Sequence, residues 1–525
     1  MPTYLSPGVY MEEVSSGAKP IEAVGTALAA FIGFTERGPL NDPILVTNWT
    51  QYTNTFGNFA EGSYLPHAVY GYFLNGGGSA YVVRVGEAPA GADGSADGQA
   101  KSDAGNAAQP RASAELVSGG DNAKPTFTVR ALAAGREGND ITVEVTDASE
   151  PADDKFKLIV RKAGQVEETF DNLTTHRGPT NVITVVRLQS KLITVDEIKG
   201  APLAVPSKGA QIALAGGDLP AIPEVSPEHY VGDTAVRTGF SGLEAIEDVT
   251  MLCVPDLMAA YQAGSIDEEA VKAVQLAMIA HCELMADRVA ILDTPPGLNA
   301  QQIKDWRVNF AGYDSKYATL YWPWVKVMDP LSGKAIFMPP SGHVAGIWAR
   351  NDETRGVHKA PANEVARGVI ALQNNITKGE HDQLNPVGVN CIRAFPGQGI
   401  RIWGARTLSS DPEWRYLNVR RLFNFVEKSI LSGTNWIVFE PNDQRLWDAV
   451  RRTINGFLRR VWRTGALFGR TPAEAFFVKC DEENNPPENR DVGIVTVDVG
   501  IAPVKPAEFV VFRLSQFSAG AELEE

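Results

Sequence analysis

Cysteine is scarce in this sequence, and no two cysteines have the spacing of a metal site or a disulfide framework. The chain has 525 residues and four cysteines, which lie far apart and form no Cys-x-x-Cys motif. That scatter excludes a disulfide scaffold and a zinc knuckle as the basis of the fold. We expect buried thiols in a reducing compartment at Cys253, Cys282, Cys391 and Cys480.

Long hydrophobic runs and a basic leader are also missing. The apolar stretch nearest the N-terminus, Ala23 to Phe34, is too short to span a bilayer. A formal net charge of -15 argues against nucleic acid or an anionic membrane as the main partner of the whole surface. We expect a soluble chain that carries no export signal and does not insert directly into membranes.

No catalytic or cofactor motif is complete. Val289 to Asp293 resembles the metal strand of nucleotide hydrolases, but no G-x-x-x-x-G-K-[ST] loop occurs, so a buried strand end is favoured. Gly76 to Gly78 lacks the G-x-G-x-x-G spacing and indicates a turn. His281-Cys282-Glu283 has no second ligand cluster, and no H-E-x-x-H is present. We predict no enzyme activity, no cofactor and no metal.

The residues that are present belong to a large globular protein. Hydrophobic residues make up 44% of the chain and charged residues 21%, while 49 Gly and 33 Pro imply many turns and short strands. The length predicts three or four domains. The fold class expected is therefore α+β and multidomain.

The first half of the chain divides by composition. The first twenty or so residues alternate apolar and polar positions between prolines, which favours an extended arm over a helix. Glu87 to Asp121 is rich in Ala, Gly, Ser and Asp, which is typical of a linker. Residues 125 to 215 alternate between turn signals and predict a small antiparallel β-domain. The pattern of residues 225 to 390 predicts an α/β domain, with a helix over Asp267 to Met285 and a strand over Ala318 to Trp322.

The last 130 residues contain the clearest helices. Asp411 followed by Pro412 predicts a capped helix that Gly433 ends, and a second amphipathic helix begins near Asn442 and runs to Gly465. Three strand candidates follow: Ala475 to Cys480, Val492 to Ile501 and Glu508 to Phe517. The chain is thus expected to end, as it begins, in extended structure.

Seven blocks in order, covering nearly the full chain, resemble the contractile tail sheath family of myophages, R-type bacteriocins and extracellular contractile injection systems. The segment 87 to 215 matches it least specifically. The blocks are YLSPGVYMEEV, IGFTERGP, YWPWVKVMDP, PPSGHVAGIWARND, RGVHKAPAN, GIRIWGARTLSSDPEWRYLNVRRLFNFVEKSI and FEPNDQRLWDAVRRTINGFLRRVWRTGALFG.

The resemblance implies an architecture in which the N- and C-terminal parts build one inner sheath domain. An α/β domain and a small outer β-domain are inserted between them. The implied division is an N-terminal arm 1–21, inner domain 22–86, linker 87–121, outer β-domain 122–220, α/β middle domain 221–390, inner domain 391–507 and C-terminal arm 508–525.

The resemblance also implies a function. Such a subunit polymerises as a helical sleeve of stacked rings around an inner tube and contracts to drive the tube through a target envelope. Its partners are copies of itself, the inner tube protein, and baseplate and terminal cap proteins. Assembly is expected in the bacterial cytoplasm, after which the particle stays there or is released as a phage tail or phage-tail-like particle.

In that family the terminal arms add strands to the sheets of neighbouring subunits. β-strand addition supplies backbone hydrogen bonds, while alternating side chains set the register. The side chains expected to set it are Leu5, Val9, Met11 and Val14 at one end and Phe509, Val511 and Leu514 at the other. The competing interpretation is that both segments are ordinary edge strands or frayed termini.

Positive charge gathers in the C-terminal region of this acidic chain. From Arg393 to Arg470 the sequence carries fourteen Lys and Arg against six Asp and Glu. We predict a ridge on the second helix that meets an acidic surface of the inner tube, against the alternative of a solvated helix face. The ridge residues are Arg452, Arg459, Arg460 and Arg463.

Two other classes of function stay open from the sequence. A noncontractile filament or capsid-like structural protein would share the acidic composition and the arms, but would polymerise without a tube. A nucleotide-dependent enzyme would show hydrolysis as a monomer, and the missing phosphate loop weighs against it.

Overall fold

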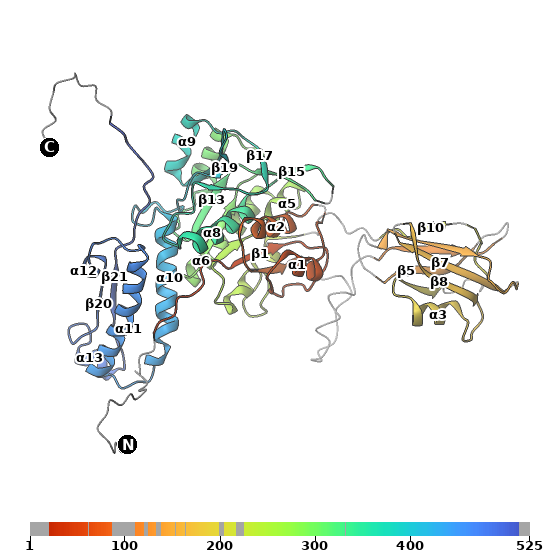
Figure 1. The fold of residues 1–525 in the computed structure, drawn as a ribbon, viewed down its shortest axis with the longest axis horizontal. Helices are drawn as coiled ribbons and strands as arrows, with labels where there is room; N and C mark the ends of the chain where they lie inside the picture. The colour runs from red at the N-terminus through yellow and green to blue at the C-terminus, as the bar shows by residue number, and fades with distance from the viewer. Residues whose placement is uncertain are drawn as a thin grey trace, which may run out of the picture.

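The computed structural model describes residues 20–60, 62–86, 111–119, 124–132, 138–152, 154–162, 164–198, 204–209, 211–216, 225–330 and 332–513. These residues form an α/β body, an outer β-domain and a C-terminal group of helices with a small hairpin (Figure 1). The outer domain stands apart from the body in the figure, and α10 and α11 lie side by side at the opposite end.

The body is built around a nine-stranded sheet in the order β16-β19-β18-β13-β12-β11-β1-β3-β2. Its six central strands, from β18 to β3, are parallel, and the edges are antiparallel. The strands are β1 (Ala29–Gly33), β2 (Ile44–Val46), β3 (Ala80–Arg84), β11 (Met251–Cys253), β12 (Val289–Asp293), β13 (Ala318–Trp322), β16 (Glu364–Val365), β18 (Val389–Phe395) and β19 (Gly399–Ile402).

Helices cover both faces of this sheet, so β1, β11, β12 and β13 at its centre are buried throughout and form nearly continuous apolar runs. One face packs against α4 (Pro227–Val231), α5 (Asp256–Gln262), α6 (Glu268–Met285), α7 (Ala300–Asp305), the π-helix η3 (Trp306–Ala311) and α9 (Lys378–Leu384). The other face packs against α1 (Trp49–Phe56), α2 (Leu65–Asn75), α8 (Ser341–Arg355) and a three-stranded sheet of β14 (Val325–Met328), β15 (Ala335–Met338) and β17 (Val369–Leu372).

Glycines let α2 and α8 approach each other closely. A Cβ at Gly342 would meet the backbone of Ala68 at 2.4 Å, and one at Gly346 would meet the carbonyl of Tyr72 at the same distance. Because any side chain there would separate the helices, this contact aligns the two helices side by side on one face of the sheet.

The outer domain is a β-sandwich, so the antiparallel β-domain that the alternating pattern predicts is found, but the domain also holds one helix that the pattern does not predict. It contains β4 (Ser113–Val117), β5 (Pro125–Ala131), β6 (Ile141–Thr146), β7 (Lys155–Lys162), β8 (Gln165–Thr174), α3 (Val182–Gln189), β9 (Ile193–Glu197) and β10 (Gln211–Ala213). The linker predicted over 87–121 is wrong at its end, because β4 pairs with β5. Only Leu116 of β4 is buried, so the apolar pattern there is too weak to indicate a strand.

The C-terminal group packs α10 (Leu417–Thr434) and α11 (Gln444–Arg463) around their own apolar core. Four short elements complete it: α12 (Pro472–Ala475), β20 (Phe476–Lys479), α13 (Pro487–Asp491) and β21 (Asp498–Ile501).

The predicted ends of α10 are wrong. Tyr416 is its N-cap, and Gly433 lies inside its last turn. Asp411 instead accepts the backbone N–H of Glu413 in a turn before the helix, at 2.9 Å.

The grouping of 22–86 with 391–507 into one inner domain is also wrong. β1 and β3 are inserted into the same sheet as β11, β12 and β13, between β11 and the edge strand β2. Backbone pairing therefore joins 22–86 to the middle domain. Among the described residues up to 86, only Ile21, just before that range, belongs to the apolar core of the C-terminal helices. Strands β18 and β19 likewise belong to the body, so the C-terminal group begins with α10.

Candidate functional site

The ligand crevice of the α/β sheet is filled by the protein's own side chains. In such sheets ligands bind at the carboxyl ends of the strands where the strand order reverses, here between β1 and β11. Asp256 follows β11 and accepts hydrogen bonds from the N–H of Phe34 at 2.6 Å, the N–H of Leu65 at 3.0 Å and the hydroxyl of Ser63 at 2.9 Å. The N-terminus of α2 is therefore already bound to a carboxylate.

The next strand shows the same arrangement. Asp293 ends β12 and accepts hydrogen bonds from the N–H and hydroxyl of Ser341, at 3.0 and 2.5 Å, where α8 begins. Burial raises the pKa of both Asp256 and Asp293 to about 7, against the lowering effect of these hydrogen bonds. Two helix N-termini that would otherwise attract an anion are thus capped from within.

The other residues weighed as chemical signals have structural surroundings. His281 lies 3.3 Å from the guanidinium of Arg288, and Glu283 accepts the hydroxyl of Ser315 at 2.6 Å. Gly76 closes α2 with φ 114°, as a turn requires. Across the described ranges, no three His, Cys, Asp or Glu side chains gather closely enough to hold a metal ion. Among the helices in those ranges, none has the length and apolar character needed to cross a bilayer.

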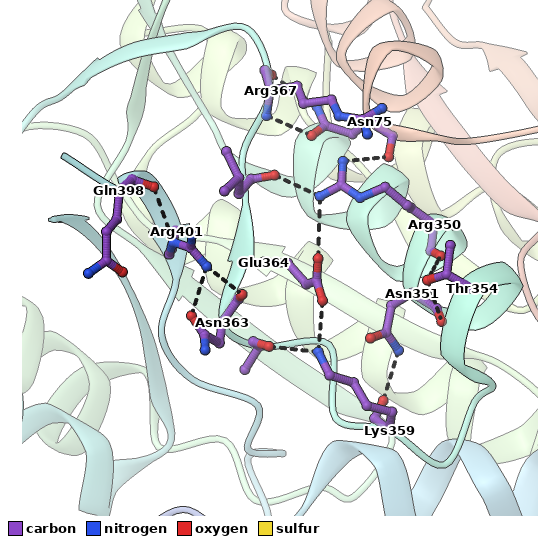
Figure 2. Close-up of polar contacts among 12 residues, drawn as sticks. Asn75, Arg350, Asn351, Thr354, Lys359, Asn363, Glu364, Arg367, Gln398 and Arg401 are labelled. Atoms are coloured by element: carbon purple, nitrogen blue, oxygen red, sulfur yellow. Dashed lines mark hydrogen bonds and ion pairs between the residues drawn. The ribbon is translucent and has the colours of Figure 1, made fainter.

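The RGVHKAPAN block, residues 355–363, forms a strap between α8 and the edge of the sheet (Figure 2). Arg350 donates to the carbonyls of Asn75 and Val365, at 3.0 and 2.7 Å. Glu364 accepts the ammonium of Lys359 at 2.9 Å. Arg401 of β19 donates to both oxygens of Asn363. The block therefore fastens edge strand β16 onto the body.

A buried ion pair joins the body to the C-terminal helices. Arg421 of α10 contacts Asp352 of α8 at 2.6 Å, and each side chain is 4% exposed. The Arg421 guanidinium also donates to the carbonyl of Thr26 at 3.0 Å and stacks on Trp348. Three distant segments thus meet at one charged pair.

The described part of the chain begins near the end of the predicted N-terminal arm. Leu5, Val9, Met11 and Val14 lie outside the described residues. The described chain begins at residue 20, and Ile21 is 1% exposed in the core formed by α10 and α11. The position where the arm would leave the subunit is therefore at the C-terminal helices.

The predicted C-terminal arm is anchored at its first residue. Glu508 forms an ion pair with Arg406 at 2.6 Å and accepts the side-chain amide of Asn385 at 2.8 Å. Beyond it, residues 508–513 adopt no regular secondary structure within the chain, although the sequence predicts a strand. Phe509 and Val511 are 74% and 78% exposed, and Leu514 lies outside the described residues.

The hairpin of β20 and β21 is a two-stranded sheet. Its strands pair from Phe476 opposite Ile501 to Lys479 opposite Asp498. In the part of the chain that the structure describes, neither outer edge pairs with a further strand. An isolated two-stranded sheet with free edges is marginal alone and is a template for added strands.

The predicted arginine ridge divides into two groups. Arg452, Arg459 and Arg463 are exposed and lie at spacings of seven and four, on the side of α11 opposite its buried residues. Arg460 is also exposed but lies on the flank of the helix, and its guanidinium donates to the carbonyl of Ile21 at 2.6 Å. Sequence spacing did not separate these roles, because it does not show which side of the helix faces the arm.

Sequence reasoning missed an apolar tip at the loop between α10 and α11. Phe439 is fully exposed with φ 68°, and Val438 beside it is 63% exposed. Leu431 near the end of α10 is 69% exposed. No periodic pattern indicates this tip, since it lies in a short irregular connection.

Comparison with known protein families shows the family to which this chain belongs. Residues 224–408 match the phage tail sheath protein central domain, and residues 409–517 match the phage tail sheath C-terminal domain. The chain belongs to the phage tail sheath family. It is a structural subunit of a contractile sheath.

Tail sheath proteins of two phages are similar to this chain. The tail sheath protein of Burkholderia phage BcepMu is 24% identical over 529 residues, which cover 96% of this chain and 95% of the relative. The tail sheath protein of Vibrio phage KVP40 is 24% identical over 400 residues, which cover 71% of this chain and 56% of that longer protein.

Solved structures share the fold. The sheath complex of PVC, an extracellular contractile injection system, in its contracted state has a TM-score of 0.57 and 22% identity, covering 98% of this chain and 99% of that one. A sheath tail protein from Desulfitobacterium hafniense has a TM-score of 0.55 and 12% identity, covering 90% of this chain and 94% of that one.

The buried carboxyl of Asp293 predicts a pH-dependent stability. Its pKa rises to about 7 on folding, so the free energy of unfolding falls as pH rises from about 4 to 7. Asn cannot ionise and retains an acceptor for the Ser341 N–H. Asp293→Asn should therefore be more stable than the wild type at pH 8 by about 1–3 kcal/mol, and equal to it near pH 4. Urea unfolding at both pH values measures the difference in the free energy of unfolding between the two proteins. A variant that is less stable than the wild type by the same amount at both pH values would contradict the prediction.

Breaking the Arg421–Asp352 pair should destabilise the subunit strongly. Asp352→Asn leaves the Arg421 charge buried without its counterion, at a cost of about 3–5 kcal/mol. Asp448→Asn is the matched control, because the Asp448–Arg451 pair is about 40% exposed and contributes at most about 1 kcal/mol. Urea unfolding of the wild type and the two variants measures these changes. Equal decreases in the free energy of unfolding for the two variants would count against the prediction.

Proposed function

We propose that this sheath subunit polymerises as a helical sleeve around an inner tube, held together by its terminal arms, and contracts to drive the tube through a target envelope. The proposal extends to a baseplate and a terminal cap as partners and to assembly in the bacterial cytoplasm. The helical sheaths among the structural neighbours support it, since the anti-feeding prophage sheath in its contracted state has a TM-score of 0.57.

The observation that supports the proposal best is the β20–β21 hairpin, whose two outer edges pair with no further strand of the described chain. Two free edges give room for two further strands, and the subunit has two candidate arms to supply them. Residues 509–512 are all exposed, and Phe509 and Val511 among them have the alternating spacing that strand addition uses. Each backbone hydrogen bond contributes only about 0.5–1.5 kcal/mol, but the contribution repeats at every subunit of a polymer.

The tube contact in this proposal uses the exposed face of α11. Arg452, Arg459 and Arg463 form a stripe of positive charge with Arg445, one further step of seven along the helix. An acidic tube surface fits this stripe, because complementary charges guide docking and set its register.

A noncatalytic mechanism is consistent with the body of the protein. The crevice between β1 and β11 holds Asp256, so the body is arranged as a rigid support. Contraction then takes its free energy from the arrangement of subunits: the extended sheath is a metastable lattice that collapses into a better-packed one.

A proline in the hairpin edge tests strand addition. The N–H of Ala502 donates to the carbonyl of Ala475, so by the alternation of an antiparallel ladder the N–H of Val499 points to the free edge. Val499→Pro should remove that donor, leave the monomer folded and abolish sheath formation seen by electron microscopy.

Val499→Thr is the control, since it keeps the N–H and a β-branched side chain. Normal sheaths from the proline variant would refute strand addition at this edge. Circular dichroism melting of both monomers shows whether the fold is intact.

Charge reversal on α11 tests the tube contact. Arg452, Arg459 and Arg463 are exposed, so changing all three to Glu should leave monomer stability within about 1 kcal/mol of the wild type. Binding to the tube protein in co-sedimentation should fall at least about tenfold.

The matched control changes Arg177, Arg187 and Lys191 to Glu, which alters the net charge equally on exposed positions of the outer domain. Equal co-sedimentation of the two triple variants would contradict the tube contact. Sheaths that form equally well with and without tube protein would favour the noncontractile filament instead.

A further inference from the structure

The first described residues of the chain lie in the angle between α10 and α11. Ile21 packs into the core that these helices share, where it joins Leu422, Val426 and Phe457. A Cβ on Gly433 would meet the Ile21 side chain at 2.6 Å, so the last turn of α10 is shaped around it. The segment therefore enters the C-terminal helices through a fitted apolar contact.

Polar bonds hold the same segment at three places. Arg460 donates from Nη2 to the carbonyl of Ile21 at 2.6 Å, and the N–H of Val24 donates to the buried hydroxyl of Ser429 at 3.2 Å. Two residues further on, Arg421 donates to the carbonyl of Thr26. Residues 21–26 are thus fastened to both helices, in contrast to the exposed Glu22 between the anchors.

Packing alone does not hold this segment. A groove of about 990 Å³ runs beside it, between α8, α10 and α11. The groove is lined by residues 21 and 23–28 together with Val357, Phe425 and Val461. Since one side of the segment faces an open groove, the direct bonds to Arg460 and Ser429 decide its course.

We propose that Arg460, Gly433 and Ser429 form a clamp that sets the direction in which the N-terminal arm leaves the subunit. The clamp carries tension from the arm into α10 when subunits are linked. This inference rests on the proposed function, because it assigns the root of the arm that joins neighbours. It gives Arg460 a positioning role distinct from the tube contact proposed for Arg452, Arg459 and Arg463.

The physical reason is the effective concentration of the arm at its acceptor. An arm finds a neighbouring strand edge most often when the unattached length matches the distance to be crossed. Release of residues 21–25 would lengthen the unattached segment and let it leave in many directions. The neighbour's edge would then be met less often, although the arm itself is unchanged.

The test compares Arg460→Met with Arg459→Met in the full chain. Met keeps most of the apolar length but donates no hydrogen bond. A glutamate-specific protease that cleaves after Glu22 reports how often the root opens in the monomer. We expect Arg460→Met to be cleaved at least about tenfold faster than the wild type, and Arg459→Met to be cleaved within about twofold of it. Arg460→Lys, which retains a donor, should recover part of the protection.

Sheath yield in electron micrographs provides the second readout. Arg460→Met should form fewer sheaths than Arg459→Met at equal monomer stability, and Gly433→Ala, which displaces Ile21, should act in the same direction. Equal cleavage rates for the two methionine variants would overturn the clamp.

A variant lacking residues 2–19 separates the two proposals. If this variant assembles like the wild type, the N-terminal arm is not needed for assembly and that part of the proposed function is refuted. The clamp is then tested by the cleavage rates alone. If it fails to assemble while Arg460→Met assembles normally, the arm stands and the clamp is refuted.

Discussion

The buried pair of Arg421 and Asp352 is the interaction on which the arrangement of this subunit depends. A buried charge pair is tolerated only when nearly every donor and acceptor is satisfied, and here they are shared with Thr26 and the ring of Trp348. The pair therefore works only if α8, α10 and the root of the N-terminal segment are all in place. Through it the α/β body, the C-terminal helices and the segment at Thr26 are joined, which suits a subunit of a contractile sheath.

The α/β body uses a ligand-binding architecture for support. Its sheet order reverses between β1 and β11, where nucleotides bind in related architectures. Asp256, which follows β11, and Asp293, which ends β12, occupy two helix N-termini and join α2 and α8 to the strand ends. What would be a binding crevice is thus converted into a fastening between sheet and helices. The interaction surfaces that we propose lie instead at the C-terminal helices: the hairpin edges, the arginine stripe of α11 and the two places where the predicted arms begin.

Much of the local structure was predictable from the sequence where a pattern is long and ends in clear signals. The helix after Asp267 and the strand Ala318–Trp322 are found as predicted, because a capping residue and a buried apolar run decide them locally. The start of α10 was not predictable. Residues before Tyr416 are held in a turn and an extended segment by contacts with the body, such as Ser410 with Asp314, and these override the Asp-Pro signal. β4 was missed because only one of its side chains is buried.

The sequence by itself determined the class of this protein: an acidic, multidomain α+β chain, without a complete catalytic motif, whose ordered blocks resemble tail sheaths. The tertiary structure decided which segments share a domain, since strand pairing between β1 and β11 joins residues more than two hundred positions apart. It also decided the roles of neighbouring arginines. Arg459 and Arg460 are adjacent in sequence and both exposed, but successive residues of a helix point about 100° apart. Arg460 therefore reaches the carbonyl of Ile21, while Arg459 lies on the side opposite the buried residues.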